Sequence, residues 1–357
     1  MVVGSTKRRL LSIAAAVLLL LALLLLGLHV GAGEKKIQQQ LSLQYDTADP
    51  QFRRSMSVLL GPPLIDGNQV QSLLNGDEIF AAMLADIRAA RRSITFETYI
   101  YWADSIGREF AQALSERARA GVKVHVMLDW VGSAKLDRSH VELMRGAGVE
   151  VERFHEPRLT QMSRMNNRTH RKLLIIDGTV GFTGGVGIAD KWRGNAQDPQ
   201  HWRDTHFRVQ GPVVAQMQAV FMDNWIKATG RVLDGEPYFP QLQPRGNQTA
   251  QMFSSSPAGG SASMHLMYLM AINAARRSID LSNSYFVPDE LTIGALVDAA
   301  RRGVKIRIIV PGGEIDAEIV RRASRALWGD LLEAGLEMHV YQPTMYHCKV
   351  VIVDGLL

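Results

Sequence analysis

The sequence has almost no cysteine: Cys348 is the single one in 357 residues. A lone cysteine excludes an intramolecular disulfide and any zinc site built on several thiolates. The sequence also has no His-Glu-x-x-His pair and no acidic loop of the EF-hand type. We therefore expect a chemistry that needs no bound metal ion and no cofactor.

Neither sign of charge dominates, since 40 Lys and Arg are opposed by 35 Asp and Glu, leaving a net charge of +5. This mild excess suits an anionic partner, such as phospholipid head groups or nucleic acid, and suits an ordinary basic surface equally well. The aromatic residues, 7% of the chain, do not interleave with Lys and Arg as they would in a groove for single-stranded nucleic acid. Composition therefore disfavours a nuclease without choosing a substrate.

One long apolar run is present, at residues 10–30, and a basic tail at residues 1–9 with Lys7, Arg8 and Arg9 precedes it. About 20 apolar residues are enough to cross a bilayer as a helix. We expect a single-pass membrane anchor here, with a cleaved signal peptide as the alternative. The basic tail favours an N-terminus inside the cell and the rest of the chain outside it.

The rest of the chain contains an internal repeat. The segment Ala-Ala-Arg-Arg-Ser-Ile occurs at residues 89–94 and again at 274–279, and further matches follow at similar offsets. The expected parts are a linker at 31–63, a first half at 64–230, a connecting segment at 231–262 rich in Pro, Gly, Ser and Gln, and a second half at 263–357.

Helices and strands alternate in both copies. We expect helices at 77–90, 107–120 and 139–146 with strands at 94–100 and 122–128, then helices at 263–275, 291–302 and 317–334 with strands at 279–286 and 304–310. Such alternation is typical of βαβ units, in which helices cover both faces of a parallel sheet. The predicted fold is α/β, with two halves related by a pseudo-two-fold axis and mostly parallel sheets.

Each copy ends on the same motif, His-x-Lys followed by four aliphatic residues and Asp-Gly, at residues 170–178 and 347–355. On a strand, residues i and i+2 share a face, so each His and its Lys point the same way. A strand that buries an ammonium needs an anionic partner, and a phosphate would serve both side chains. A solvent-exposed strand end would explain one such motif, but not two at equivalent points of a repeat.

These residue types predict phosphodiester chemistry. One histidine would attack phosphorus and form a covalent phosphohistidine, while the other would protonate the leaving alcohol and then activate water or an acceptor alcohol. Lys172 and Lys349 would neutralise the non-bridging oxygens in the transition state. The sequence does not fix which histidine is the nucleophile.

The duplicated motif resembles the phospholipase D superfamily, and its surroundings at residues 96–100, 167–172, 182–185 and 202–206 resemble the bacterial cardiolipin synthase branch. The resemblance covers roughly Gly61 to the end. It implies phosphatidyl transfer between two phosphatidylglycerol molecules at a membrane, with no obligatory protein partner. A hydrolytic phospholipase D and a nuclease of the same superfamily remain alternatives.

The resemblance also implies roles for individual residues. The catalytic residues would be His170, Lys172, Asp177, His347, Lys349 and Asp354, the two aspartates supporting the site rather than reacting. Substrate-binding or supporting residues would be Glu97, Asn167, Gly184 and Gly185, with a surface carboxylate as the alternative for Glu97. Residues 202–204 would support the pocket structurally.

The sequence ends three residues after Asp354, at Leu357, where members of the superfamily continue with further strands and helices. We therefore expect an incomplete second half, and a membrane-tethered, inactive remnant is a further alternative.

Overall fold

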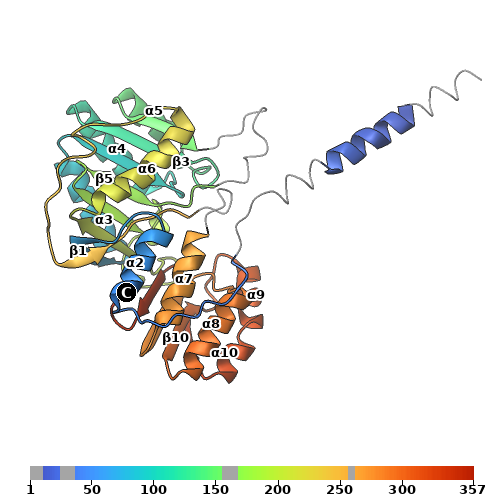
Figure 1. Cartoon of the computed structure of the whole chain (residues 1–357). Helices are drawn as coiled ribbons and strands as arrows, with labels where there is room; N and C mark the ends of the chain where they lie inside the picture. Colours follow the sequence, from blue (N-terminus) through green and yellow to red (C-terminus); the bar gives the residue numbers. More distant parts are fainter. Residues whose placement is uncertain (1–10, 25–36, 155–167, 256–261) are drawn as a thin grey trace, which may run out of the picture.

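The computed structural model describes residues 11–24, 37–154, 168–255 and 262–357 (Figure 1). An eight-stranded sheet has the order β4-β3-β2-β5-β6-β7-β1-β8, and a four-stranded sheet has the order β11-β10-β9-β12. The strands of the first sheet are β1 (Ile65–Leu74), β2 (Ser93–Thr98), β3 (Lys123–Asp129), β4 (Glu150–Phe154), β5 (Leu173–Ile176), β6 (Val180–Gly184), β7 (Thr205–Gln210) and β8 (Gln248–Ala250). Those of the second are β9 (Ser278–Asn283), β10 (Lys305–Pro311), β11 (Glu337–Tyr341) and β12 (Lys349–Val353).

The internal repeat appears as two equivalent four-stranded blocks. In β4-β3-β2-β5 and in β11-β10-β9-β12, the first three strands are parallel and the motif strand is antiparallel to its neighbour. The α/β class is confirmed, with two separate sheets. The expectation of mostly parallel sheets is wrong for the larger sheet, in which only the β2–β3 and β3–β4 pairs are parallel. Residues 177–179 join β5 to β6 in a turn, and so short a connection can join only antiparallel strands.

Helices cover both faces of the larger sheet. On one face, α3 (Asn75–Ala89), α4 (Ser105–Arg119) and α5 (Arg138–Gly146) pack on side chains such as Phe96 and Val126. On the other, α6 (Val214–Thr229) packs on Met127 and Ile175. Neighbouring residues of one strand therefore enter different cores, as the two-residue period of a strand requires.

The smaller sheet is covered on one face by α7 (Ser263–Ala274), α8 (Glu290–Arg301) and α10 (Gly329–Glu333). Its other face lies against β1 and β7 across a hollow lined by Phe207, Ile309 and Ile352. The single helix expected at 317–334 is wrong. The structure has α9 (Glu318–Ala326) and α10, with an interruption before Gly329, a residue type that weakens helices.

The described part of the expected linker, residues 37–63, packs on the second half (Figure 1). Within it α2 (Pro50–Leu59) lies beside α7 and buries Phe52 and Met56 against Met270. Further upstream, Thr47 donates a hydrogen bond of 3.3 Å to the Asp354 carboxylate. Residues 11–24 are helical, and no helix in the described ranges has both the length and the apolar character needed to cross a bilayer. The predicted anchor at 10–30 extends beyond those ranges.

Candidate active site

Each motif strand begins at the border of its sheet where the neighbouring parallel strand, β2 or β9, ends. The start of β5 pairs with the end of β2 through Leu173 and Glu97, and the start of β12 pairs with the end of β9 through Lys349 and Asn283. The halves meet at this edge, because the Arg203 amide donates 2.9 Å to the carbonyl of Met345 and the His347 amide donates 2.8 Å back to Arg203. The fold therefore brings the two His-Lys pairs into one site.

Each lysine contacts the histidine two residues before it, as strand geometry predicts. Lys172 Nζ lies 3.5 Å from His170 Nδ1, and Lys349 Nζ lies 2.9 Å from His347 Nε2. Both ammonium groups also donate to the carbonyl oxygen of their histidine, at 3.1 and 2.8 Å. No carboxylate among the described residues forms a salt bridge with either lysine. In the described part of the chain, Asp204 attracts both lysines only from beyond salt-bridge distance, so their ammonium groups are free to bind an anion directly.

Burial dominates the electrostatics of these groups. Loss of water around Lys172, together with repulsion from Lys349, lowers the pKa of Lys172 to about 7, and burial lowers that of Lys349 to about 8. His170 is exposed as a whole residue, but loss of water around its ring, together with the charges of the two lysines, lowers its pKa to about 3. An anion in the site would relieve the repulsion between the cations.

Asp204 links the halves through the ring of His347. It is fully buried, and its Oδ2 accepts hydrogen bonds from His347 Nδ1 at 2.8 Å and from Trp192 Nε1 at 2.9 Å. Burial lowers the pKa of His347, and the bond to Asp204 opposes that effect. With the Nδ1 proton held by the carboxylate, Nε2 faces Lys349 with its lone pair. Sequence reasoning gave Asp204 a structural role and missed this contact.

Gly184 and Gly185, at the end of β6, lie beside this carboxylate and the strand that carries it. A Cβ atom at Gly185 would come within 2.0 Å of Asp204 Oδ1, and one at Gly184 would come within 2.5 Å of the Cα of His206. The resemblance implied substrate binding or support for this pair. The missing side chain of Gly185 leaves room for the Asp204 carboxylate, and that of Gly184 leaves room for the neighbouring strand at His206.

Glu97 is fully buried, so the alternative of a surface carboxylate is wrong. Its Oε1 accepts hydrogen bonds from the Thr169 hydroxyl and, at 2.6 Å, from Asn224 Nδ2. A second buried carboxylate, Asp129, accepts the backbone amide of Thr169 at 3.0 Å. Burial raises the pKa of Glu97. These groups hold the residue immediately before His170, and Glu97 acts on the histidine through Thr169.

The motif aspartates lie at the opposite ends of their strands, about 16 Å along the strand from the lysines. The Asp177 carboxylate accepts the backbone amides of residues 91–93, and Asp354 accepts those of residues 276–278. Both aspartates have left-handed backbones, with φ of 52° and 55°. They fix the turns and stay out of the reacting centre. Asn167 lies outside the described residues.

Two tyrosines that sequence reasoning missed stand beside the histidines. The ring centre of Tyr99 is 4.8 Å from that of His170, and the ring centre of Tyr285 is 6.0 Å from that of His347. The motif lysines lie over these rings, at 5.6 and 5.1 Å from their centres. The signal was present in the repeat, because a tyrosine follows the equivalent strand in each half. Within the described ranges, no cluster of His, Cys, Asp or Glu could hold a metal ion.

Comparison with known proteins agrees with this site. The family model described as "Cardiolipin synthase, PLD-like domain" matches residues 83–225 and 268–356, which include both motifs. Cardiolipin synthase of Geobacillus kaustophilus is 37% identical over 298 residues, covering 83% of this chain and 59% of that protein. Cardiolipin synthase A of Pseudomonas fluorescens is 35% identical over 304 residues, covering 85% and 63%.

The chain therefore spans about three fifths of the length of these relatives. Among solved structures, phosphatidylserine synthase of Haemophilus influenzae superposes with a TM-score of 0.62 at 13% identity, over 85% of this chain and 80% of that one, which supports the fold. Because the family model covers more than half of the sequence and both His-Lys pairs, this chain belongs to the cardiolipin synthase family with the phospholipase D-like domain.

Proposed function

We propose that this protein transfers a phosphatidyl group from one phosphatidylglycerol to another, giving cardiolipin and free glycerol. The observation that carries the proposal is the pair of ammonium groups of Lys172, which is buried, and Lys349, which is half-buried, each beside a histidine and neither in a salt bridge with a carboxylate among the described residues. A phosphodiester supplies the missing negative charge. The relatives named cardiolipin synthase support this choice of substrate.

His170 is the nucleophile in this mechanism. Its lowered pKa keeps the ring neutral at physiological pH, so a nitrogen lone pair is available. A bond forms between that nitrogen and phosphorus, and the bond from phosphorus to the glycerol oxygen breaks. The motif lysines bind the non-bridging oxygens, whose charge is greatest in the transition state.

His347 is the general acid and base. The anionic substrate raises the pKa of His347 against the effect of burial, and Asp204 stabilises the imidazolium. His347 first gives its Nε2 proton to the departing glycerol. It then takes a proton from the hydroxyl of a second phosphatidylglycerol, which attacks phosphorus and breaks the bond to His170.

Residues 10–30 anchor the protein in the cell membrane in this proposal, with the N-terminus inside. The supporting features are the apolar run and the basic tail that precedes it. An anchor would keep the site close to a substrate that does not leave the bilayer.

The test uses the full chain reconstituted in vesicles of phosphatidylglycerol, with lipids and glycerol measured by mass spectrometry. We expect cardiolipin and glycerol in equal amounts from the wild type and none from His170→Ala. A substrate with a p-nitrophenyl leaving group, which departs without an acid, should leave a phosphatidyl group on His170 in His347→Ala. Phosphatidic acid as the product would show that the reaction is hydrolysis and not transfer. The absence of any product from the wild type would overturn the proposal.

A further inference from the structure

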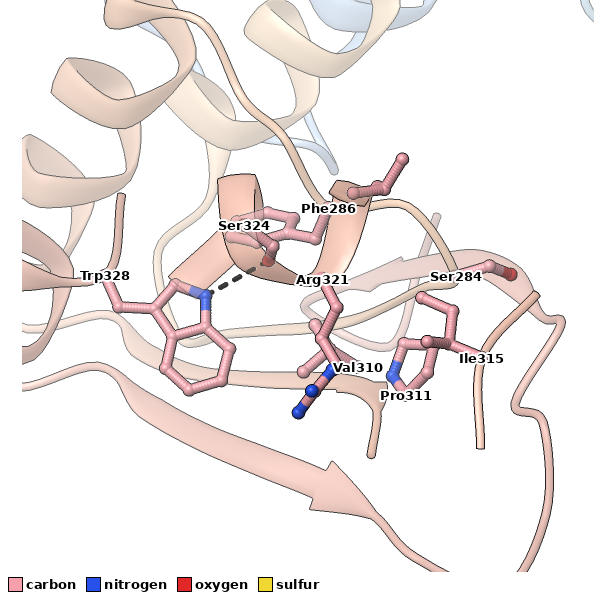
Figure 2. A pocket seen from close by; sticks show the side chains of 9 residues that line it. Ser284, Phe286, Val310, Pro311, Ile315, Arg321, Ser324 and Trp328 are labelled. Atoms are coloured by element: carbon pink, nitrogen blue, oxygen red, sulfur yellow. Dashed lines mark hydrogen bonds between the residues drawn. The ribbon is translucent and has the colours of Figure 1, made fainter. Parts of the chain in front are cut away.

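The tryptophans divide into a buried set and a half-buried set. Trp192, Trp202 and Trp225 are 1%, 8% and 0% exposed. Trp102, Trp130 and Trp328 are half-buried and lie in loops. Trp102 follows β2, and Trp130 follows β3 directly. The third, Trp328, lies beneath α9 and lines a small cavity together with residues at the ends of β9 and β10 (Figure 2).

All three half-buried rings therefore lie at one edge of the molecule, where parallel strands of both halves end. The same edge carries the active site, because the end of β2 pairs with the start of β5 beside His170. Apolar side chains are also exposed here. Ile319 on α9 is 79% exposed, and Val287, in the loop after β9, is 49% exposed.

Each half-buried indole has an exposed cation over its ring. Lys135 Nζ lies 4.1 Å from the centre of a ring of Trp102, and the Arg168 guanidinium lies 5.1 Å from that of Trp130. In the second half the Arg325 guanidinium lies 5.9 Å from the ring of Trp328, whose indole N–H donates to Ser324 at 3.2 Å (Figure 2). Such stacking orients both members of a pair.

The aspartates of the same loops bond to other groups and form no salt bridge with these cations. Asp104 and Asp137 cap the first turns of α4 and α5 by accepting amides from Gly107 and Ser139. Asp316 accepts the hydroxyl of Tyr285. None of the three cations forms an ion pair with a described residue. Their charge is therefore directed at solvent around the mouth of the site.

We propose that this edge is the surface that lies against an anionic lipid bilayer. Indoles prefer the head-group level of a membrane, where one part of the ring is apolar and another is wet. The cations beside them attract the negative surface, each contributing about a fivefold change in binding. Exposed Ile319 and Val287 enter the outer acyl region. This proposal rests on the proposed phospholipid substrate, and it adds the face on which the protein meets that substrate.

The test measures quenching of tryptophan fluorescence by brominated acyl chains, with the full chain reconstituted in phosphatidylcholine vesicles of increasing phosphatidylglycerol content. All six tryptophans lie downstream of the apolar run, so the signal reports on the catalytic part alone. The edge variant is Lys135→Gln with Arg325→Gln. Its matched control is Lys123→Gln with Lys305→Gln, two exposed lysines at the first residues of β3 and β10, which lie at the opposite edge.

We expect quenching to grow with phosphatidylglycerol content in the wild type. The edge variant should lower the docking constant about 25-fold at low salt, and the control should leave it within twofold. Thermal unfolding by circular dichroism checks that both variants are folded. Equal behaviour of the two variants, or equal quenching without phosphatidylglycerol, overturns the proposal.

Transfer on a monomeric short-chain phosphatidylglycerol separates this proposal from the proposed function. The edge variant should match the wild type there, because no surface is involved. A loss of transfer on the monomeric lipid would place these residues in the site and overturn the docking role. A wild type that docks but transfers nothing overturns the function and leaves docking standing.

Discussion

The two motif histidines are held by different means. The ring of His347 is bonded to a carboxylate, Asp204, that comes from the other half. The ring of His170 has no carboxylate partner among the described residues, and the support reaches it through the backbone, where Glu97 and Asp129 hold Thr169. A carboxylate on the ring favours a histidine that must carry a proton, and its absence favours a neutral nucleophile. The repeat has duplicated the motif without duplicating its support.

The sequence of the second half explains this difference. By alignment of the repeated strands, Ser282 of β9 takes the place of Glu97, and Pro311 of β10 takes the place of Asp129. Neither residue can supply a carboxylate. The second half therefore cannot build the support that holds His170, and His347 depends on the first half instead.

The largest effect is expected from Asp204→Asn, which removes the charge and keeps the shape. The amide cannot stabilise the imidazolium or fix its tautomer, so the transfer rate should fall by about 10²–10⁴-fold. Steady-state production of cardiolipin measures the loss. The same variant should still form the intermediate on His170 from the p-nitrophenyl substrate.

The matched control is Asp198→Asn, because Asp198 bonds His201 Nδ1 at 2.7 Å outside the site. This variant should keep its transfer rate. Equal losses in the two variants would mean that Asp204 has no special place beside His347, and the comparison of the two histidines would fail.

A smaller effect, about tenfold, is expected from pH. An ammonium is charged below its pKa, so kcat/KM for the anionic lipid should fall as pH rises through about 7, where Lys172 loses its proton, and about 8, where Lys349 does. Lys172→Arg should move the first fall to higher pH and Lys349→Arg the second, because arginine stays charged. A profile that neither variant changes would assign the fall to other groups.

The smallest effect is expected from Thr169→Val, which removes the hydroxyl that bonds Glu97. We expect a decrease in kcat of about fivefold with KM unchanged, because His170 is positioned less well but lipid contacts persist. Thr169→Ser should restore the rate. Thr344→Val is the control, since this buried threonine lies three residues before His347 and donates its hydrogen bond to the carbonyl of His201 instead of to a carboxylate. A loss of rate in Thr344→Val without one in Thr169→Val would show that the support through Thr169 does not position His170.

The meeting of the two motifs could be predicted from the sequence, whereas the role of Asp204 could not. A repeated pattern with a fixed strand period places His170 and His347 at equivalent strand ends. A single site can contain both histidines only if these two strand ends face each other. A carboxylate that crosses between halves has no period and no fixed spacing from its partner. The usable signal was the pair Gly184 and Gly185, since adjacent glycines at a strand end indicate a close neighbour.

The mixed pairing of the larger sheet was missed for a related reason. Apolar residues such as Leu174 and Ile175 fit a buried strand of either direction, so composition cannot distinguish parallel from antiparallel pairing. The turn at Asp177 and Gly178 carried that information, because its length excludes a crossover. The groups that bind Asp177 are backbone amides, which nearly every residue type has, so the sequence does not reveal them. The repeated Arg-Arg-Ser segments supply these amides in both halves.

The carboxylates of Asp177 and Asp354 explain why the motif has a fixed spacing. Each is bonded to three amides at one border of its sheet, while the His-Lys pair stands at the other border. The four aliphatic residues between them measure the width of the sheet. One residue fewer would turn the far end to the opposite face and leave either the amides or the phosphate without a partner. The spacing of the motif therefore follows from the length of strand needed to cross the sheet, as well as from the chemistry of the His-Lys pair.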